Sequence, residues 1–582
     1  MPKGRDTMTS RGMWRHGRSF VISLLVLIAA VGPQVCPAQN SAGSPAAEKI
    51  RLGEQMYREG ILPSGEPLRA YVKGDIPVPG TAFSCVSCHL RSGLGSVEGG
   101  VFTPPTNGDK LFQPFQLLFK GLEQKYFPLP PRRPAYTDAT LAEVIRSGAT
   151  PTGGTLNDVM PRYLLEDEDM ALLLSYLKGL SSHYSPGVSA TTLHFATVIT
   201  DEVSPEERTA MLAPLEQYIA IKNNQARAYR APGNKSRQMA ENMLVSKELA
   251  TRTLTLSRWI LKGSPETWRK QLEEYNRKDP VFALLGGVSS GEWKPIHDFS
   301  EANRIPCLFP ITNLPVISET DWYTLYPSKG YYQEGEAAAR YLHTDGVLPQ
   351  GAAVVQIVRD SPEGRALAAG FRQTWLDSGN GAPLTVLLKA GQTVTKEILR
   401  KATGKKNVAV VMVWDGPECV PALQSLVTAG KRPLSLFVSA RYLGEKLWTL
   451  PEQIRPFTYI SYPYTFALSV TYSAMGNAKL QEDQRQALGQ ADVTIKNHAQ
   501  EIASLDTTLT QIVTMALMDL RGNYYRDNFF DVIGMIADQP SSVFGRLSFG
   551  PGQRYASKGC YIVQLTKGPR PELVKKSGWV IH

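Results

Sequence analysis

The pentapeptide Cys85-Val86-Ser87-Cys88-His89 constrains this chain more than any other feature of the sequence. Its C-x-x-C-H spacing is the attachment sequence for haem c. Two thiols separated by two residues bond the two vinyl groups of one porphyrin, and the histidine that follows is placed to bind the iron. A thioredoxin-type redox pair would not need His89, and the chain has no second C-x-x-C with which to build a zinc site. The motif therefore predicts one covalent haem, bonded to Cys85 and Cys88, with His89 on the iron.

The second axial ligand of the iron must come from elsewhere in the sequence. Met160 lies in a predicted loop immediately before a proline, so its side chain is not committed to a helix face. Met170 falls in a stripe with Leu173 that is spaced as one face of a helix, which is typical of a core residue. Met160 is therefore the predicted ligand. His183 is the other candidate side chain, and an open sixth position is the remaining alternative.

The first 38 residues have the order of a secretory signal peptide. A basic start is followed by the apolar run Phe20–Val31 and by a small-residue cleavage site that ends at Ala38. The apolar run is shorter than the roughly 20 residues that a membrane-spanning helix needs. We therefore expect residues 1–38 to be a signal peptide, the protein to be exported to the periplasm, and no membrane span to remain after cleavage.

Composition and charge exclude some classes of protein. The chain has 42% hydrophobic and 20% charged residues, as folded proteins do. Its formal charge of +10 falls to +6 when the leader, with five basic residues and one acid, is removed. This charge is too small for a nucleic-acid-binding surface on a chain of this length. Three further cysteines, Cys307, Cys419 and Cys560, predict one disulfide and one buried thiol in an oxidising compartment, with the pairing left open.

The length and the pattern of the chain predict several domains. Residues 48–182 are rich in Gly and Pro between two helical ends, and residues 183–192 are a small, polar linker. From 193 to 582, apolar runs alternate with amphipathic helical stretches, which predicts parallel sheets covered by helices on both faces. Strands are expected at Val281–Leu285, Ala352–Val358, Val408–Val413 and Leu434–Val438, and a long, charge-rich helical region is expected at 477–520.

Residues 48–182 resemble a monohaem class I cytochrome c, of the kind found as cytochrome subunits of periplasmic dehydrogenases. The matching stretches are Gly53-x-x-Met56-Tyr57, the C-x-x-C-H motif, Arg133–Tyr136, Met160–Tyr163 and Tyr176-Leu177. The resemblance implies an all-α domain, contact between its N- and C-terminal helices, and axial ligation by His89 and Met160. His/Met ligation leaves no open iron position, so it implies electron transfer with a periplasmic redox partner, such as a dehydrogenase, rather than catalysis.

Residues 193–582 are similar to type I periplasmic solute-binding proteins of the branched-chain amino acid receptor kind. The matching stretches are Leu285–Ser290, Ile305-Pro306, Phe309–Asn313, Tyr332–Gly335, Val354–Gly364 and Leu547–Leu565. The resemblance implies an α/β fold of two lobes around a ligand. Ser289, Ser290 and Thr312 would line the first lobe, and Glu363 and Asp415 the second. From the residues alone, Ser289 is equally well explained as a helix N-cap. Receptors of this kind commonly have an aromatic residue near the position of Glu363, where this chain has Pro362-Glu363-Gly364. An ordinary amino-acid ligand is therefore not expected, and a cationic or hydroxylated ligand, or none, fits the two acids as well.

These resemblances predict a c-type cytochrome that transfers electrons through its haem, with a C-terminal half that senses a ligand or docks a partner. The alternative is a solute-binding protein for an amino-acid-like ligand, related to those of ABC transporters, whose haem is an accessory redox sensor. Residues 193–582 contain no H-E-x-x-H motif and no phosphate-binding loop, so an enzyme is the less favoured class. The sequence leaves open the ligand, the partner, the reduction potential, the oligomeric state and any coupling between ligand binding and haem redox.

Overall fold

The computed structural model describes residues 44–73, 75–98, 101–116, 132–230, 252–345, 348–349, 351–428, 432–465 and 498–581. Residues from Lys49 onward form one compact unit. The predicted signal peptide lies outside the described residues, as does the first part of the helical region expected at 477–520. No helix in the described ranges is long and apolar enough to cross a membrane.

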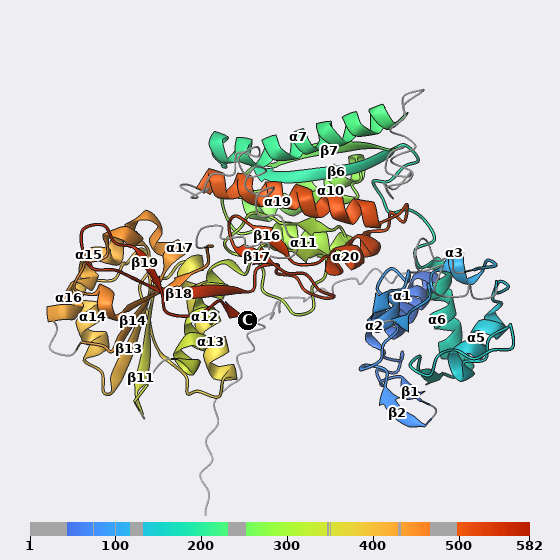
Figure 1. Cartoon of the computed structure of the whole chain (residues 1–582), viewed down its shortest axis with the longest axis horizontal. Coiled ribbons are helices and arrows are strands. Elements are labelled where there is room, and N and C mark those ends of the chain that lie inside the picture. The colour runs from blue at the N-terminus through green and yellow to red at the C-terminus, as the bar shows by residue number, and fades with distance from the viewer. Residues whose placement is uncertain are drawn as a thin grey trace, which may run out of the picture. The chain divides into compact units, whose positions relative to one another are not determined.

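The N-terminal segment, residues 44–182, combines helices with short strands (Figure 1). Its helices are α1 (Pro45–Glu59), α2 (Val86–His89), α3 (Gly108–Leu111), α5 (Asp138–Ser147) and α6 (Asp167–Gly179). Antiparallel pairs join β1 (Arg69–Val72) to β2 (Ile76–Pro79) and to β5 (Arg162–Leu164), and β3 (Val97–Glu98) to β4 (Val101–Phe102). The expected all-α domain is therefore wrong. Pro77 and Pro79, which cannot donate a backbone hydrogen bond, occupy the edge strand β2, where prolines are tolerated.

Helices α1 and α6 contact each other, as the cytochrome resemblance implied. Gly53 allows the close approach, because a Cβ atom at this position would lie 2.3 Å from the carbonyl oxygen of Leu172. The rings of Tyr57 and Tyr176 meet beside it, with centroids 5.4 Å apart. The two ends of the N-terminal segment are thereby packed into one core, to which Met170 also belongs.

The first sheet of the C-terminal segment is parallel, with strand order β10-β9-β8-β6-β7. Its strands are β6 (Thr192–Thr200), β7 (Thr253–Leu261), β8 (Ala283–Leu285), β9 (Cys307–Leu308) and β10 (Thr324–Leu325). Phe195 and Ile199 of β6 face a layer formed by α7 (Pro205–Arg230), α19 (His498–Asp519) and α20 (Arg526–Gly534). Ala196 and Val198 face the opposite layer, formed by α10 (Pro265–Lys278) and α11 (Lys294–Asn303). Helices α7 and α19 lie side by side on their face (Figure 1).

The second sheet has strand order β12-β11-β13-β14-β15-β18-β19, with β20 paired to β18. Apolar side chains of its strands alternate between two helical layers, one with α12 and α13 and the other with α14, α15 and α16. The strands are β11 (Ala353–Val358), β12 (Leu384–Leu387), β13 (Val408–Trp414), β14 (Ser435–Ser439), β15 (Thr458–Tyr462), β18 (Gly559–Leu565), β19 (Leu573–Lys575) and β20 (Val580–Ile581). The helices are α12 (Gly330–Thr344), α13 (Pro362–Asp377), α14 (Lys396–Thr403), α15 (Val420–Leu423), α16 (Ser425–Thr428) and α17 (Ala440–Leu443).

The expected strands are confirmed as β8, β11, β13 and β14, and the expected cover of both sheet faces is confirmed too. The end of the chain differs, because β18 pairs antiparallel with β15, β19 and β20. The strands β16 (Gln539–Ser541) and β17 (Gly545–Leu547) form a hairpin. Short 3₁₀ helices lie at Pro417–Cys419, Gly444–Thr449 and Arg455–Phe457.

Two chain segments run together where the polypeptide passes from the first sheet to the second. Tyr326, just after β10, donates its backbone N–H to the Arg554 carbonyl at 2.8 Å. Ser557, just before β18, donates to the Pro327 carbonyl at 2.8 Å. These paired segments therefore join the two sheets through backbone hydrogen bonds.

The cysteines disagree with the predicted disulfide. Cys307, Cys419 and Cys560 are all free and fully buried. They belong to three different clusters of core side chains, which keeps their sulfur atoms apart. Each is a small apolar core residue rather than part of a cross-link.

Candidate functional site

The residues predicted to hold a haem line one cavity in the N-terminal segment. Cys85 immediately precedes α2, and Cys88 and His89 are its last two residues. Met160 reaches the same cavity from the loop before β5. The fold therefore brings Met160 to the motif although the two lie far apart in the sequence.

His89 has the environment of a metal ligand. It is 5% exposed, and its Nδ1 lies 2.8 Å from the carbonyl oxygen of Pro104. Nδ1 therefore carries the proton and donates, which leaves the Nε2 lone pair free. Within the described residues this buried Nε2 has no hydrogen-bond partner. Burial lowers the pKa of His89 to about 4, so the ring is neutral and able to bind a metal at neutral pH.

The wall of the cavity is mostly apolar. Leu141, Val144 and Ile145 of α5 and Leu173 of α6 contribute to it. Among the described residues no group of three or more His, Cys, Asp or Glu side chains could hold a metal ion. A metal ion at His89 would therefore need a prosthetic group that supplies most of the ligands of the metal and has a largely apolar surface. The two thiols, neither of which is in a disulfide, the unpartnered imidazole and the apolar wall fit haem c.

The other candidates for the sixth ligand lie elsewhere. Met170 is 3% exposed within the core around α1 and α6. His183 is exposed, and its Nδ1 lies 3.0 Å from the hydroxyl of Ser182. Neither residue lines the cavity of His89, whereas Met160 does. Of the three candidate side chains, Met160 is therefore the one that shares a cavity with His89.

Ser289 and Ser290 lie on the turn after β8. Gly286 and Gly287 take positive φ values of 60° and 104° and interrupt the strand, and Val288 then pairs again with Ile199 and Ile311. The N–H of Ser290 donates to the hydroxyl of Thr200 at 3.1 Å. The N-cap of the next helix, α11, is Trp293, so the alternative that Ser289 is a helix N-cap is wrong.

Residues 287–291 also carry a motif that the sequence analysis missed. Gly-Val-Ser-Ser-Gly has the G-x-S-x-G spacing of a hydrolase nucleophile turn. The hydroxyl of Ser289 accepts a hydrogen bond from the N–H of Gly291 at 3.2 Å. In the part of the chain that the structure describes, no histidine is hydrogen-bonded to Ser289.

The remaining predicted ligand-binding residues differ in how many hydrogen bonds their side chains form within the protein. The Thr312 hydroxyl accepts from the N–H of Leu314 at 3.0 Å. Glu363 lies in the first turn of α13 and forms no hydrogen bond or ion pair among the described residues, although its charge contributes to the raised pKa of Tyr331. Asp415 is 1% exposed, and its two oxygens accept from Gly416, Arg359, Thr393 and Val394 at 2.6–3.3 Å. These hydrogen bonds give Asp415 a structural role. Of the two predicted acids, Glu363 is the one whose carboxylate could still bind a solute.

Arg441 is a buried residue between the sheets that the sequence analysis missed. It is the second residue of α17, which directly follows β14, and its side chain is 4% exposed. Its guanidinium contacts Glu334 of α12 at 3.5 Å and Glu501 of α19 at 3.2 Å, and donates to the side chain of Asn313. Arg441 thus joins the second sheet to helix α19 of the first. Its place two residues beyond the end of the parallel strand β14 was the signal that the sequence offered.

The comparisons with known proteins concern the C-terminal segment. The periplasmic binding protein family matches residues 261–568. No curated protein matches the chain. Solved structures with a similar fold include a putative branched-chain amino acid ABC transporter from Rhodospirillum rubrum, at 13% identity, with 66% of this chain and 100% of that chain covered and a TM-score of 0.43.

Two further similar structures were solved with a small molecule bound. One is a branched-chain amino acid ABC transporter from Thermus thermophilus with bound valine, at 14% identity, with 67% and 97% of the two chains covered and a TM-score of 0.41. The other is a solute-binding protein of an ABC transporter from Rhodopseudomonas palustris BisB5 in complex with 3,4-dihydroxy benzoic acid, at 12% identity, with 67% and 98% covered and a TM-score of 0.41. Since the family match spans more than half of its residues, the chain belongs to the periplasmic binding protein family.

Proposed function

We propose that this protein is a periplasmic solute-binding protein, related to those that serve ABC transporters, and that its N-terminal segment carries one haem c. The observation that carries the first half of the proposal is the family match over residues 261–568. The solute binds between the two sheets, at the carboxyl ends of their parallel strands, where open α/β sheets bind ligands. Because of this family match, we propose solute binding as the main function, ahead of the electron transfer that the sequence analysis favoured.

The proposed solute site is formed by Ser289, Ser290 and Thr312 beside the first sheet and by Glu363 beside the second. Asp415 supports the second side through its four hydrogen bonds rather than by contact with solute. The carboxylate of Glu363 is partly exposed and has no partner among the described residues. A carboxylate in this state favours a small solute with a cationic or hydroxyl group.

A ligand screen on the full chain tests the solute site. L-lysine, L-valine and 3,4-dihydroxybenzoate are added separately, and the unfolding temperature is followed, because a ligand that binds the folded state stabilises it. The expected result is a rise in Tm with the cationic or the hydroxylated probe, lost in Glu363→Gln. Glu397→Gln is the matched control, since Glu397 also lies in the first turn of a helix but is exposed. An unchanged response in Glu363→Gln would remove this residue from the site.

The second proposed function is electron exchange through the haem. The unpartnered, buried Nε2 of His89, in one cavity with Cys85, Cys88 and Met160, favours it. Cys85 and Cys88 would bond the haem, and His89 and Met160 would hold its iron. A haem bound in this way supplies reversible one-electron transfer to a periplasmic redox partner. The apolar wall would keep water from a bound haem, and the Pro104 carbonyl accepts from Nδ1 of His89 and so orients its ring.

The visible spectrum of protein made with a haem c maturation system tests this second function. The expected result is a covalently bound, low-spin haem whose weak long-wavelength Met–iron band is lost in Met160→Ala. Met170→Leu is the control, because Met170 lies in the core and not in the cavity. Rapid binding of carbon monoxide by the reduced wild type would show an open iron position, and electron transfer would then yield to ligand sensing at the haem.

A further inference from the structure

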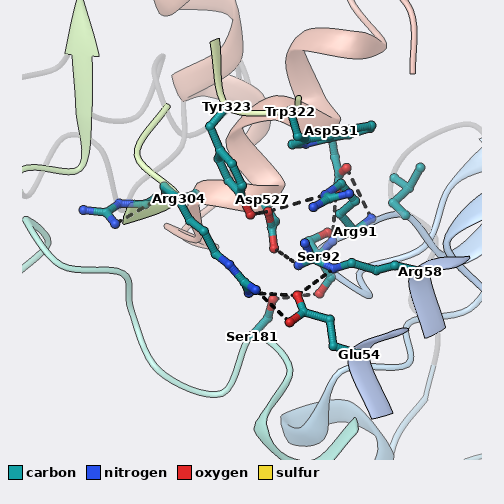
Figure 2. A network of polar contacts seen from close by, with 12 residues as sticks. Glu54, Arg58, Arg91, Ser92, Ser181, Arg304, Trp322, Tyr323, Asp527 and Asp531 are labelled. Atoms are coloured by element: carbon teal, nitrogen blue, oxygen red, sulfur yellow. Dashed lines mark hydrogen bonds and ion pairs between the residues drawn. The ribbon is translucent and has the colours of Figure 1, made fainter. Parts of the chain in front are cut away.

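The backbone directly after His89 is held by a helix from the far end of the chain. Helix α2 ends at His89 and Leu90 takes a positive φ of 64°, so the chain leaves the helix there and the N–H groups of Arg91 and Ser92 lie beyond its hydrogen bonds. The carboxylate of Asp531, on helix α20, accepts hydrogen bonds from both of these N–H groups. One of its carboxylate oxygens accepts from the N–H of Arg91 at 3.3 Å and the other accepts from the N–H of Ser92 at 2.8 Å. Figure 2 shows Asp531 beside both residues.

These hydrogen bonds are shielded from water. Asp531 is 8% exposed and Ser92 is fully buried. Ser92 is held from a second side, because the hydroxyl of Ser181 donates to its carbonyl oxygen at 2.7 Å. From the side of α1, the hydroxyl of Tyr57 donates to the Leu90 carbonyl at 2.8 Å. The turn after His89 is therefore held by hydrogen bonds at Leu90, Arg91 and Ser92. Among the side chains that make these bonds, Asp531 is the one that is both buried and acidic.

A second carboxylate of α20 binds the same part of the N-terminal segment. Asp527 lies one helical turn before Asp531, so both point from the same face. Asp527 accepts from Arg58 at 2.6 Å and from the hydroxyl of Tyr323 at 2.7 Å, and it lies 3.8 Å from Nε of Arg91. The Arg91 guanidinium also lies 4.2 Å from the centre of the Trp322 ring. The network in Figure 2 thus joins the haem-binding turn to the first sheet through directional contacts.

We propose that Asp531 is a positioning residue of the haem site, which holds the turn of His89 and lowers the reduction potential of its iron. The inference rests on the proposed haem. Asp531 bonds the backbone two and three residues after His89, and a buried negative charge there would stabilise the more positive ferric state, because charges interact strongly at low dielectric. Hydrogen bonds and charges just outside the iron ligands are among the means by which proteins tune a haem. The C-terminal segment therefore sets the potential of a haem bound by the N-terminal segment.

Redox titration of the haem-loaded full chain tests the proposal in Asp531→Asn. Asparagine keeps an oxygen that can accept from Ser92 but removes the charge. The expected result is a more positive midpoint potential, with the ratio of reduced to oxidised haem at a fixed potential raised roughly threefold or more. Titration at about pH 8 keeps the wild-type carboxylate ionised, because burial raises the pKa of Asp531 only to about 6.

Two further variants separate charge from structure. Asp519→Asn is the matched control, because Asp519 is an exposed acid of the preceding helix, and its potential should equal that of the wild type. Should Asp531→Asn not accumulate, Asp527→Asn is measured instead, with a shift of the same sign expected. Unchanged potentials in the variants that load haem would overturn the proposal. Failure of the wild type to bond haem would be a different result, in which the haem function fails and this inference falls with it.

Discussion

Glu54 of α1 accepts two hydrogen bonds from the guanidinium of Arg304, each 2.8 Å long, although 250 residues separate the two in the sequence. This parallel arrangement is the strongest geometry for an arginine–carboxylate pair. Arg304 ends helix α11 in the left-handed conformation, with φ 51°. That backbone is unfavourable for a residue with a side chain. The two hydrogen bonds between Arg304 and Glu54 offset this conformational cost.

Replacement of Glu54 by alanine should weaken the contact between the two segments. Glu54 is 9% exposed and also contacts Arg58 at 3.0 Å. Because Arg304 is more than half exposed and water can replace part of its interaction, the expected loss is about 1–2 kcal/mol of unfolding free energy. Denaturant unfolding of the full chain measures it. Glu59→Ala, an exposed change at the end of the same helix, should be close to neutral, and equal losses in both variants would contradict the assignment.

A methyl group at position 53 should disturb the contact of α1 with α6. The Cβ of Gly53→Ala would lie 2.3 Å from the Leu172 carbonyl oxygen and 2.7 Å from the Cβ of Tyr176. Since backbone atoms cannot rotate away, we expect a loss of about 1–3 kcal/mol. Gly179→Ala is the control, because nothing lies within 4 Å of a Cβ at that helical position. It should be neutral or stabilising by about 0.5–1 kcal/mol, and thermal unfolding separates the two signs.

The sequence predicted those parts of the fold that depend on local pattern. Val408–Val413 is an uninterrupted apolar run, and it forms a central strand, because a strand covered on both faces needs no polar side. The C-x-x-C-H motif is local too, since five adjacent residues carry the predicted chemistry. Met160 could be chosen because a loop before a proline differs visibly from the helical stripe of Met170.

The sequence could not predict contacts between distant residues. Asp531 and Ser92 lie 439 residues apart, and nothing in either stretch indicates that they meet. Arg441 resembles any surface arginine until the fold places Glu334 and Glu501 beside it. The β1–β2 hairpin was missed because the cytochrome resemblance implied an all-α domain. Its alternate prolines also give no strand signal, since proline argues against a strand unless the strand lies at an edge.

Asp506 should make the stability of the protein fall as pH rises. It lies on α19, is 1% exposed, and neither carboxylate oxygen has a hydrogen-bond partner among the described residues. Burial raises the pKa of Asp506 well above its ordinary value. The unfolded chain therefore loses this proton at lower pH than the folded protein does. The stabilisation is fully present below the unfolded pKa of about 4 and is lost as pH rises toward the folded pKa.

Asp506→Asn removes the titration, and so the variant should gain stability relative to the wild type as pH increases. Denaturant unfolding between about pH 4 and pH 8 measures the difference, which should grow with pH. Asp519→Asn changes an exposed acid of the same helix and should show no such trend. A constant difference between Asp506→Asn and wild type across this range would mean that Asp506 is ionised when buried.

Loss of Arg441 should loosen the connection between the two sheets. In Arg441→Met the buried carboxylates of Glu334 and Glu501 lose their shared cation, and removal of one partner from a buried ion pair costs about 3–5 kcal/mol. Methionine fills part of the space, so the loss reflects charge more than volume. Small-angle scattering should also give a larger radius of gyration, because Arg441 bonds Asn313, in the loop after β9, and Glu501 of α19, which both lie on the side of the first sheet. Arg400→Met changes an exposed arginine of α14 and is the control. If both variants unfold at the same denaturant concentration, Arg441 does not hold the sheets together.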